Sequence, residues 1–191
     1  MRLLVMCLIA SALLSLPSVA QVPVFQVTPV QSSIRFNVRS SRPLTGNFEK
    51  WNATLTFASR DPTSAVMNVE IQAASVYTPG GKNDDKLKSR ELLDVQQNPT
   101  ISFKSDKVVQ TGKTTFDVDG TFTMRGVSKP ATLNLVIADQ GGGGGYAQGI
   151  LSFNRSDFGM AGNSDNSVEV DLNIKVEQVS GPQLIRSKRF R

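Results

Sequence analysis

Carboxylates are the side chains in this sequence most suited to acid–base chemistry. The chain contains no histidine, and its one cysteine is Cys7. Ser-His-Asp and Cys-His nucleophilic schemes and histidine-ligated zinc are therefore excluded, but two carboxylates facing one cleft could still hydrolyse a glycosidic bond. Asp117 and Asp119 have the best spacing for such a pair, yet they alternate with the apolar Phe116 and Val118. We expect both carboxylates to face solvent, and we predict no enzymatic activity and no catalytic residues.

Three further motifs could hold a metal ion or a phosphate. Asp84-Asp85 would need several more convergent oxygens to bind a cation, so a solvated loop is the simpler interpretation. Asp157-Phe-Gly159 matches the metal-binding triplet of kinases, but the chain has neither of the other kinase loops. The glycines of 141–145 precede no helix with Lys-Ser/Thr, which favours a flexible hairpin loop over a phosphate cradle. We predict no metal and no cofactor.

The first twenty residues have the pattern of an export signal. Arg2 is followed by an apolar run over 3–16, by Pro17 and by the small residues of 18–20. This pattern predicts a cleaved secretory signal over residues 1–20, and hence a periplasmic or secreted protein. Because the single cysteine lies within the signal, we expect no disulfide in the mature chain.

The net charge of +5 arises from the ends of the chain. Without Arg2 and the four basic residues of 186–191, basic and acidic residues are equal in number. A nucleic-acid-binding surface needs a clustered surplus of Lys and Arg, so we predict no nucleic-acid partner. The segment 181–191 is predicted to be a disordered basic tail, with peripheral contact to an anionic membrane as the alternative.

Residues 21–180 are predicted to form one all-β domain. Short segments alternate apolar and polar residues and are separated by Gly, Pro, Asn and Asp, which is typical of antiparallel strands with one buried face. The pattern gives about eight strands, enough to close a barrel that removes unpaired edges, although a flattened sandwich fits the same pattern. The segment 84–94 departs from the alternation. Its Leu87, Leu92 and Leu93 are spaced so that a short helix could cover one end of the barrel.

The inward positions carry many aromatic and methionine side chains, which would line an interior with adaptable apolar surface. Each of these residues could equally be ordinary core. Together they could enclose an elongated apolar ligand, since burying hydrocarbon at roughly 25 cal/mol per Å² outweighs the cost of immobilising a flexible chain. The residues predicted to contact a ligand are Phe36, Phe48, Met67, Phe103, Phe122, Met124 and Phe158. The alternative is a filled barrel that binds a protein or glycan partner on its outer surface.

Several motifs of the chain resemble the YceI-like family. The most specific is Gly120-Thr-Phe-Thr-Met-Arg-Gly-Val-Ser-Lys-Pro130. Others, in chain order, are Ser33-Ile-Arg-Phe-Asn-Val38, Gly46-Asn-Phe48, Asp84-x-x-Leu87-Lys-Ser89, Asn98-Pro-Thr-Ile-Ser-Phe103 and Phe153-x-Arg-Ser-Asp-Phe-Gly159. The resemblance extends over nearly all of the chain that follows the predicted signal.

This resemblance implies a lipocalin-like antiparallel barrel in an exported protein. It also implies the ligand class, which the alternation of residues could not supply: a long isoprenoid lipid, such as a polyprenyl phosphate or a quinone-like molecule, held for transport, storage or stress protection. Members of the family are commonly dimers in which each barrel keeps its own ligand, so a homodimer is a further expectation from the resemblance.

Overall fold

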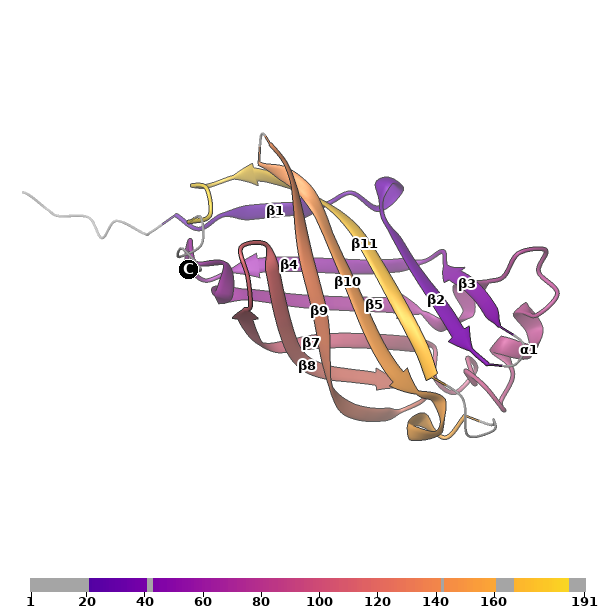
Figure 1. Ribbon diagram of the computed structural model, residues 1–191. Coiled ribbons are helices and arrows are strands. Elements are labelled where there is room, and N and C mark those ends of the chain that lie inside the picture. Colours follow the sequence, from indigo (N-terminus) through magenta and orange to yellow (C-terminus); the bar gives the residue numbers. More distant parts are fainter. Residues whose placement is uncertain (1–20, 41–42, 142, 161–166, 186–191) are drawn as a thin grey trace, which may run out of the picture.

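The computed structural model describes residues 21–40, 43–141, 143–160 and 167–185, and shows one curled antiparallel sheet (Figure 1). Its strands are β1 (Val24–Val27), β2 (Ser33–Arg39), β3 (Leu44–Phe48), β4 (Trp51–Phe57), β5 (Ala65–Gln72), β6 (Val76–Tyr77), β7 (Thr100–Gln110), β8 (Thr115–Met124), β9 (Val127–Gly141), β10 (Gly144–Asn154) and β11 (Ser167–Ser180). Its 3-10 helical turns are η1 (Pro29–Gln31), η2 (Pro62–Ser64), η3 (Ala73–Ser75) and η4 (Arg155–Phe158), and its α-helix is α1 (Asp84–Lys88). The all-β prediction is confirmed. The predicted signal and most of the predicted basic tail lie outside the described residues.

The eleven strands of the sheet correspond to eight long strands, three of which are interrupted. β1 and β2 both pair with β11, and η1 separates them at Pro29, which has no N–H for the ladder. β3 and β4 are separated by Glu49-Lys50, and β5 and β6 by η3. The prediction of about eight strands agrees with these eight long strands but misses the three interruptions, because alternation of apolar residues continues across a bend and does not reveal it.

The sheet curls until its first and last long strands meet. Neighbours are hydrogen-bonded in the order β4-β5-β7-β8-β9-β10-β11-β2-β3-β6, with β1 on β11. β3 pairs with β2 near the α1 end, and β1 lies beside β4 at the other end (Figure 1), where the rings of Phe25 and Phe57 are 5.3 Å apart. The resulting barrel surrounds one continuous apolar core.

The segment predicted to be helical over 84–94 is only partly helix. α1 ends at Lys88, and residues 89–97 continue as a series of turns. Asp94 has a φ of 48°, a left-handed backbone conformation that cannot continue a right-handed helix. Among the described residues, no helix has the length and apolar character needed to cross a membrane.

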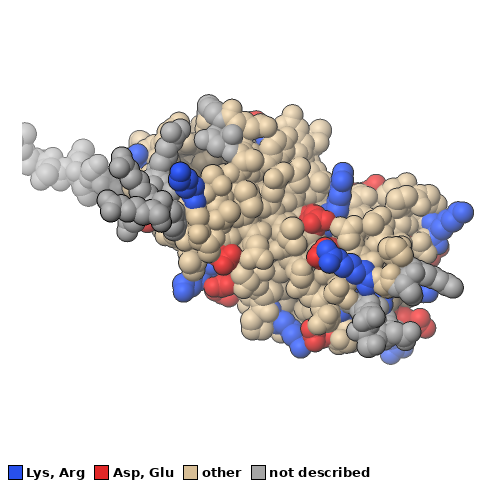
Figure 2. All heavy atoms as spheres, viewed as in Figure 1, with Lys and Arg blue, Asp and Glu red and all other residues tan. Residues whose placement is uncertain are grey.

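Charged side chains are mixed on the visible surface. In the view of Figure 2, Lys and Arg lie next to Asp and Glu at the α1 end and along β11, and the surface over β9 and β10 is largely uncharged. Basic and acidic residues, which the sequence shows to be equal in number over the body of the chain, therefore also lie close together on this face.

Candidate ligand-binding cavity

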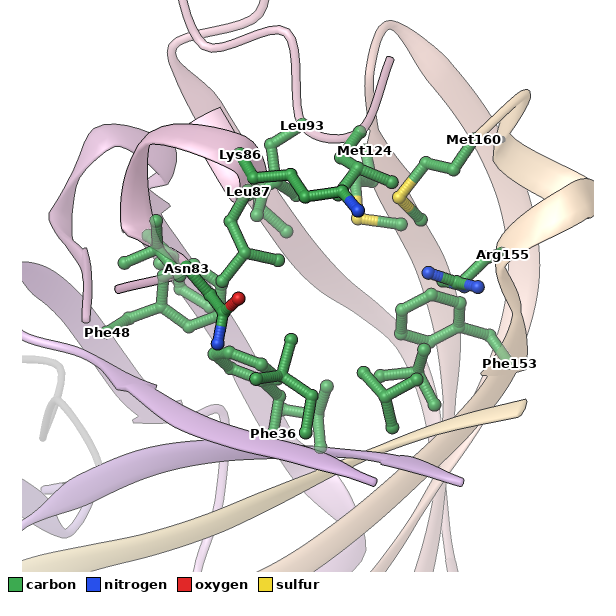
Figure 3. A pocket seen from close by; sticks show the side chains of 18 of the residues that line it. Phe36, Phe48, Asn83, Lys86, Leu87, Leu93, Met124, Phe153, Arg155 and Met160 are labelled. Carbon is green, nitrogen blue, oxygen red and sulfur yellow. The ribbon is translucent and has the colours of Figure 1, made fainter. Parts of the chain in front are cut away.

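A cavity of about 400 Å³ occupies the end of the barrel beneath α1 (Figure 3). Its wall is built from inward-facing residues of strands far apart in the sequence. The alternation places Phe36 and Val38 of β2, and Phe122 and Met124 of β8, on the inner face. The remaining lining residues of the strands are Leu44, Phe48, Ile71, Val76, Ile101, Phe153, Val168 and Val170, and Pro43 and Met160 lie in the adjoining loops.

A cap segment, residues 83–94, closes this end of the barrel. It turns Leu87, Leu92 and Leu93 into the cavity, each at most 9% exposed. The expectation that these leucines cover a barrel end is therefore confirmed. The start of the segment is fixed by Thr78, which is 1% exposed: its hydroxyl and its backbone N–H both donate to Asp84 Oδ1, over 2.7 and 2.8 Å.

The far end of the cap segment is held by the turn between β8 and β9. Arg125 and Gly126 connect Met124 to Val127 with φ values of 53° and 71°, the pattern of a type I′ hairpin turn. Arginine is an unfavourable residue in this left-handed conformation. Its side chain is nevertheless fixed there, because Nη1 donates to the backbone carbonyls of Glu91 and Leu92 over 3.1 and 2.7 Å. The hairpin thus supports the cap.

The polar groups of the lining all lie at the capped end. They are Asn83, Lys86 and Arg155, whose side chains reach the cavity from the cap segment and from η4 (Figure 3). The Lys86 ammonium has no hydrogen-bond or ion-pair partner among the described residues. Within the described part of the chain, no carboxylate is among the lining residues. The cavity therefore has an apolar body and a polar mouth that offers N–H donors and positive charge.

Four of the seven residues predicted to contact a ligand lie on the cavity wall: Phe36, Phe48, Phe122 and Met124. The other three are buried outside the lining. The Phe158 ring packs behind the wall, 5.3 Å from the rings of both Phe122 and Phe153. Met67 and Phe103 lie deeper in the core, at 9% and 6% exposure. Ligand contact by any of the seven stays a prediction.

Sequence reasoning missed two groups of lining residues. The aliphatic wall residues, such as Ile101 and Val170, obey the same alternation as the predicted aromatic ones and could have been included. The polar residues Asn83, Lys86 and Arg155 come from loops and short helical turns, where no periodic signal indicates which way a side chain points.

The carboxylates considered for catalysis do not converge on the cavity. Asp117 Oδ1 accepts a hydrogen bond from Asn134 over 2.9 Å, and Asp119 Oδ1 accepts one from Thr132 over 2.7 Å. Both pairs join the outer faces of β8 and β9, as expected from the alternation. Over the described part of the chain, no group of three or more His, Cys, Asp or Glu side chains could hold a metal ion.

Comparison with known proteins identifies both the family and the fold. The YceI-like domain matches residues 25–178. A UPF0312 protein of Pseudomonas savastanoi pv. phaseolicola is 34% identical over 139 residues, covering 70% of this chain and 72% of its own. The structure of BcnA from Burkholderia cenocepacia superposes with a TM-score of 0.72 at 20% identity, covering 78% of this chain and 99% of BcnA. A polyisoprenoid-binding domain from Saccharophagus degradans, implicated in plant cell wall breakdown, superposes with a TM-score of 0.62 at 13% identity, covering 82% and 99%.

Proposed function

Because this chain belongs to the YceI-like family, we propose that its barrel binds an isoprenoid lipid without transforming it. The observation that carries the proposal is the cavity beneath the cap segment, which has an almost wholly apolar wall and a polar mouth. A volume of about 400 Å³ lies within the range of small-molecule sites. The polyisoprenoid-binding domain of Saccharophagus degradans, which shares the fold, supports the same class of ligand.

The lipid tail would occupy the apolar body of the cavity. Removing roughly 200 Å² of hydrocarbon from water contributes about 5 kcal/mol, against which the ordering of the tail must be set. The wall is made of aromatic and aliphatic side chains together with Met124 and Met160, whose flexible thioethers adapt to an irregular chain. Such a wall recognises hydrocarbon by shape and volume.

The polar head would lie at the mouth. Asn83, Lys86 and Arg155 provide N–H donors there, and these suit either the phosphate oxygens of a polyprenyl phosphate or the carbonyl oxygens of a quinone. The lining residues that the structure describes include no carboxylate that could act as a general base, which favours binding over acid–base turnover. The alternative of a completely filled barrel is disfavoured by the cavity itself.

We place this activity in the periplasm, on the strength of the signal pattern over residues 1–20. Transport, storage and stress protection all use the same cavity. A homodimer in which each barrel holds its own lipid remains part of the proposal, and light scattering of the purified mature chain tests it.

The test of the lipid-binding function is a variant that fills the cavity. Val170 is 8% exposed and lines the wall, so Val170→Phe places a ring in the space intended for the tail. Val136→Phe is the matched control, because Val136 is 43% exposed on the outer face of β9. Organic extraction and mass spectrometry should find an isoprenoid lipid in the wild type and the control, and at least several-fold less in Val170→Phe. Equal lipid in all three proteins, or none in the wild type after expression in the periplasm, would refute the proposal.

A further inference from the structure

Two methionine side chains line the cavity at its capped end. Met124 is the last residue of β8 and Met160 follows η4, and both belong to the lining. In Figure 3 their thioethers point into the same end of the cavity as the ammonium of Lys86. The proposed lipid binding uses these two side chains only as adaptable apolar surface. The reactivity of their sulfur atoms has no part in it.

The local backbone fixes both side chains in these positions. Met124 is one of the inward-facing residues of β8 and directly precedes the Arg125-Gly126 turn. After η4, Gly159 has a φ of 65° and Met160 N–H donates to the carbonyl of Arg155 over 3.2 Å, so the chain turns at this point. Met124 is 3% exposed and Met160 is 9% exposed. Because both are buried and yet border the cavity, we expect a small molecule to reach their sulfur atoms through the cavity mouth.

Thioethers are the most readily oxidised side chains of residues 21–191. The one cysteine of the chain is Cys7, so all the sulfur of this part of the chain belongs to Met67, Met124 and Met160. Hydrogen peroxide oxidises a thioether when the sulfur attacks one peroxide oxygen and the O–O bond breaks. The second oxygen leaves as water, carrying its own proton and that of the first oxygen. The sulfur gives up two electrons to the peroxide and becomes a sulfoxide.

A sulfoxide in this wall opposes the binding of hydrocarbon. Its oxygen is a hydrogen-bond acceptor, and burying a polar group against an apolar chain without a partner is unfavourable. The side chains of Asn83, Lys86 and Arg155 line the same cavity and carry N–H donors from which a sulfoxide oxygen can accept. An oxidised methionine therefore removes apolar surface from the wall and competes for the donors that the polar head of the lipid would use.

We propose that Met124 and Met160 form an oxidation site that controls the cavity: peroxide converts them to sulfoxides in the lipid-free barrel, and the oxidised barrel binds lipid much more weakly. This inference rests on the proposed function and adds a form of regulation to it. A bound tail occupies the cavity and separates both sulfur atoms from peroxide, so lipid-loaded protein resists the reaction. Met67 provides an internal comparison, because it is 9% exposed, as Met160 is, but does not line the cavity.

The first measurement follows the oxidation of each methionine. Purified mature protein is freed of lipid, left empty or saturated with geranylgeranyl monophosphate, and treated with hydrogen peroxide, and peptide mass spectrometry records the gain of one oxygen at each site. In the empty protein, Met124 and Met160 should oxidise at least about fivefold faster than Met67. Saturation should slow the oxidation of Met124 and Met160 at least about fivefold and change that of Met67 by less than about twofold.

The second measurement compares the affinity of each protein for geranylgeranyl monophosphate before and after peroxide, by displacement of a fluorescent apolar probe. The affinity of the wild type should fall at least about tenfold. The double variant Met124→Leu, Met160→Leu has side chains of similar volume that peroxide does not oxidise, so its affinity should change by less than about twofold from its own untreated value. Met67→Leu is the matched control, and it should lose affinity as the wild type does. If the double variant fails to fold, each single variant should lose less affinity than the wild type.

The outcomes separate this inference from the proposed function. Equal oxidation rates at Met67, Met124 and Met160 in the empty protein would overturn the oxidation site and leave lipid binding intact, as would an unchanged affinity once both lining methionines are sulfoxides. A loss in the double variant as large as in the wild type would overturn the role of these two residues. No binding of geranylgeranyl monophosphate to the untreated wild type would instead overturn the proposed function.

Discussion

The strongest test of the cap architecture is the substitution Arg125→Asn. It removes the hydrogen bonds from Arg125 Nη1 to the carbonyls of Glu91 and Leu92, and with them the anchor at the far end of the cap segment. It also places at this left-handed turn position a residue that tolerates the conformation well. The variant therefore weakens the cap while it improves the hairpin.

The two effects differ in size, and one acts on the cap segment while the other acts on the hairpin. A hydrogen bond with a charged partner contributes about 1.5–3 kcal/mol, and the lower end applies to the half-buried Arg125. Asparagine tolerates the left-handed conformation better than arginine does, which stabilises the hairpin by about 1 kcal/mol. We expect a change of less than about 1 kcal/mol in the free energy of unfolding of the whole domain. Local opening of the cap should become about tenfold more frequent, because 1.4 kcal/mol corresponds to a factor of ten.

Native-state amide hydrogen exchange separates these effects. The amide N–H groups of Leu93 and Asp94 donate to the carbonyls of Leu87 and Ser89 over 3.0 and 2.8 Å, and they exchange only when the cap opens. Their exchange should be about tenfold faster in Arg125→Asn than in the wild type. Amides in β10 and β11 should change by less than a factor of about five.

The matched control is Arg39→Asn. It removes an arginine from an exposed ion pair with Glu169, at 2.7 Å, in which the Arg39 side chain is 69% exposed. Exposed pairs of this kind contribute little, so exchange in the cap should match the wild type. Wild-type exchange rates for Leu93 and Asp94 in Arg125→Asn would show that the hairpin does not hold the cap.

Two further substitutions test the packing beneath the cavity and the start of the cap. Gly120→Ala should lower the free energy of unfolding by about 1–3 kcal/mol, because its Cβ would collide with the backbone carbonyl oxygen of Lys104 and press on the Phe103 ring. At Gly144 the nearest atom would lie 3.6 Å away, so Gly144→Ala should be close to neutral in urea denaturation. Thr78→Val should lower it by about 2 kcal/mol, because a buried hydroxyl that donates to Asp84 is lost. Thr78→Ser keeps the hydroxyl and should lose less than half as much; equal losses would locate the effect in packing and not in the hydrogen bond.

The architecture could be predicted because it follows from local chemistry. The alternation in segments such as 34–38 and 116–124 indicates strands with one buried face, and this is what β2 and β8 show. The same rule placed Asp117 and Asp119 on the outside. Inward or outward direction depends only on the parity of a position along a strand, so a single sequence carries it.

The extent of the cavity could not be predicted in this way. Phe103 and Phe122 are both inward-facing and directly paired, yet Phe122 lines the cavity and Phe103 does not. Which of them meets empty space depends on the stagger of all the strands around the barrel and on where Gly120 lets a ring settle. These are relations between distant segments, and alternation within one segment contains no information about them. The mouth residue Arg155 is placed by the same long-range geometry.

The buried residues outside the cavity lining have a consequence for the protein without a ligand. Residues such as Ile34, Val118 and Leu133 are at most 2% exposed and make their contacts with other side chains, independently of any guest molecule. The chain therefore has a packed core of its own, and the stability of the fold does not depend on a bound molecule. The proposed exchange of lipid can therefore take place without unfolding of this core.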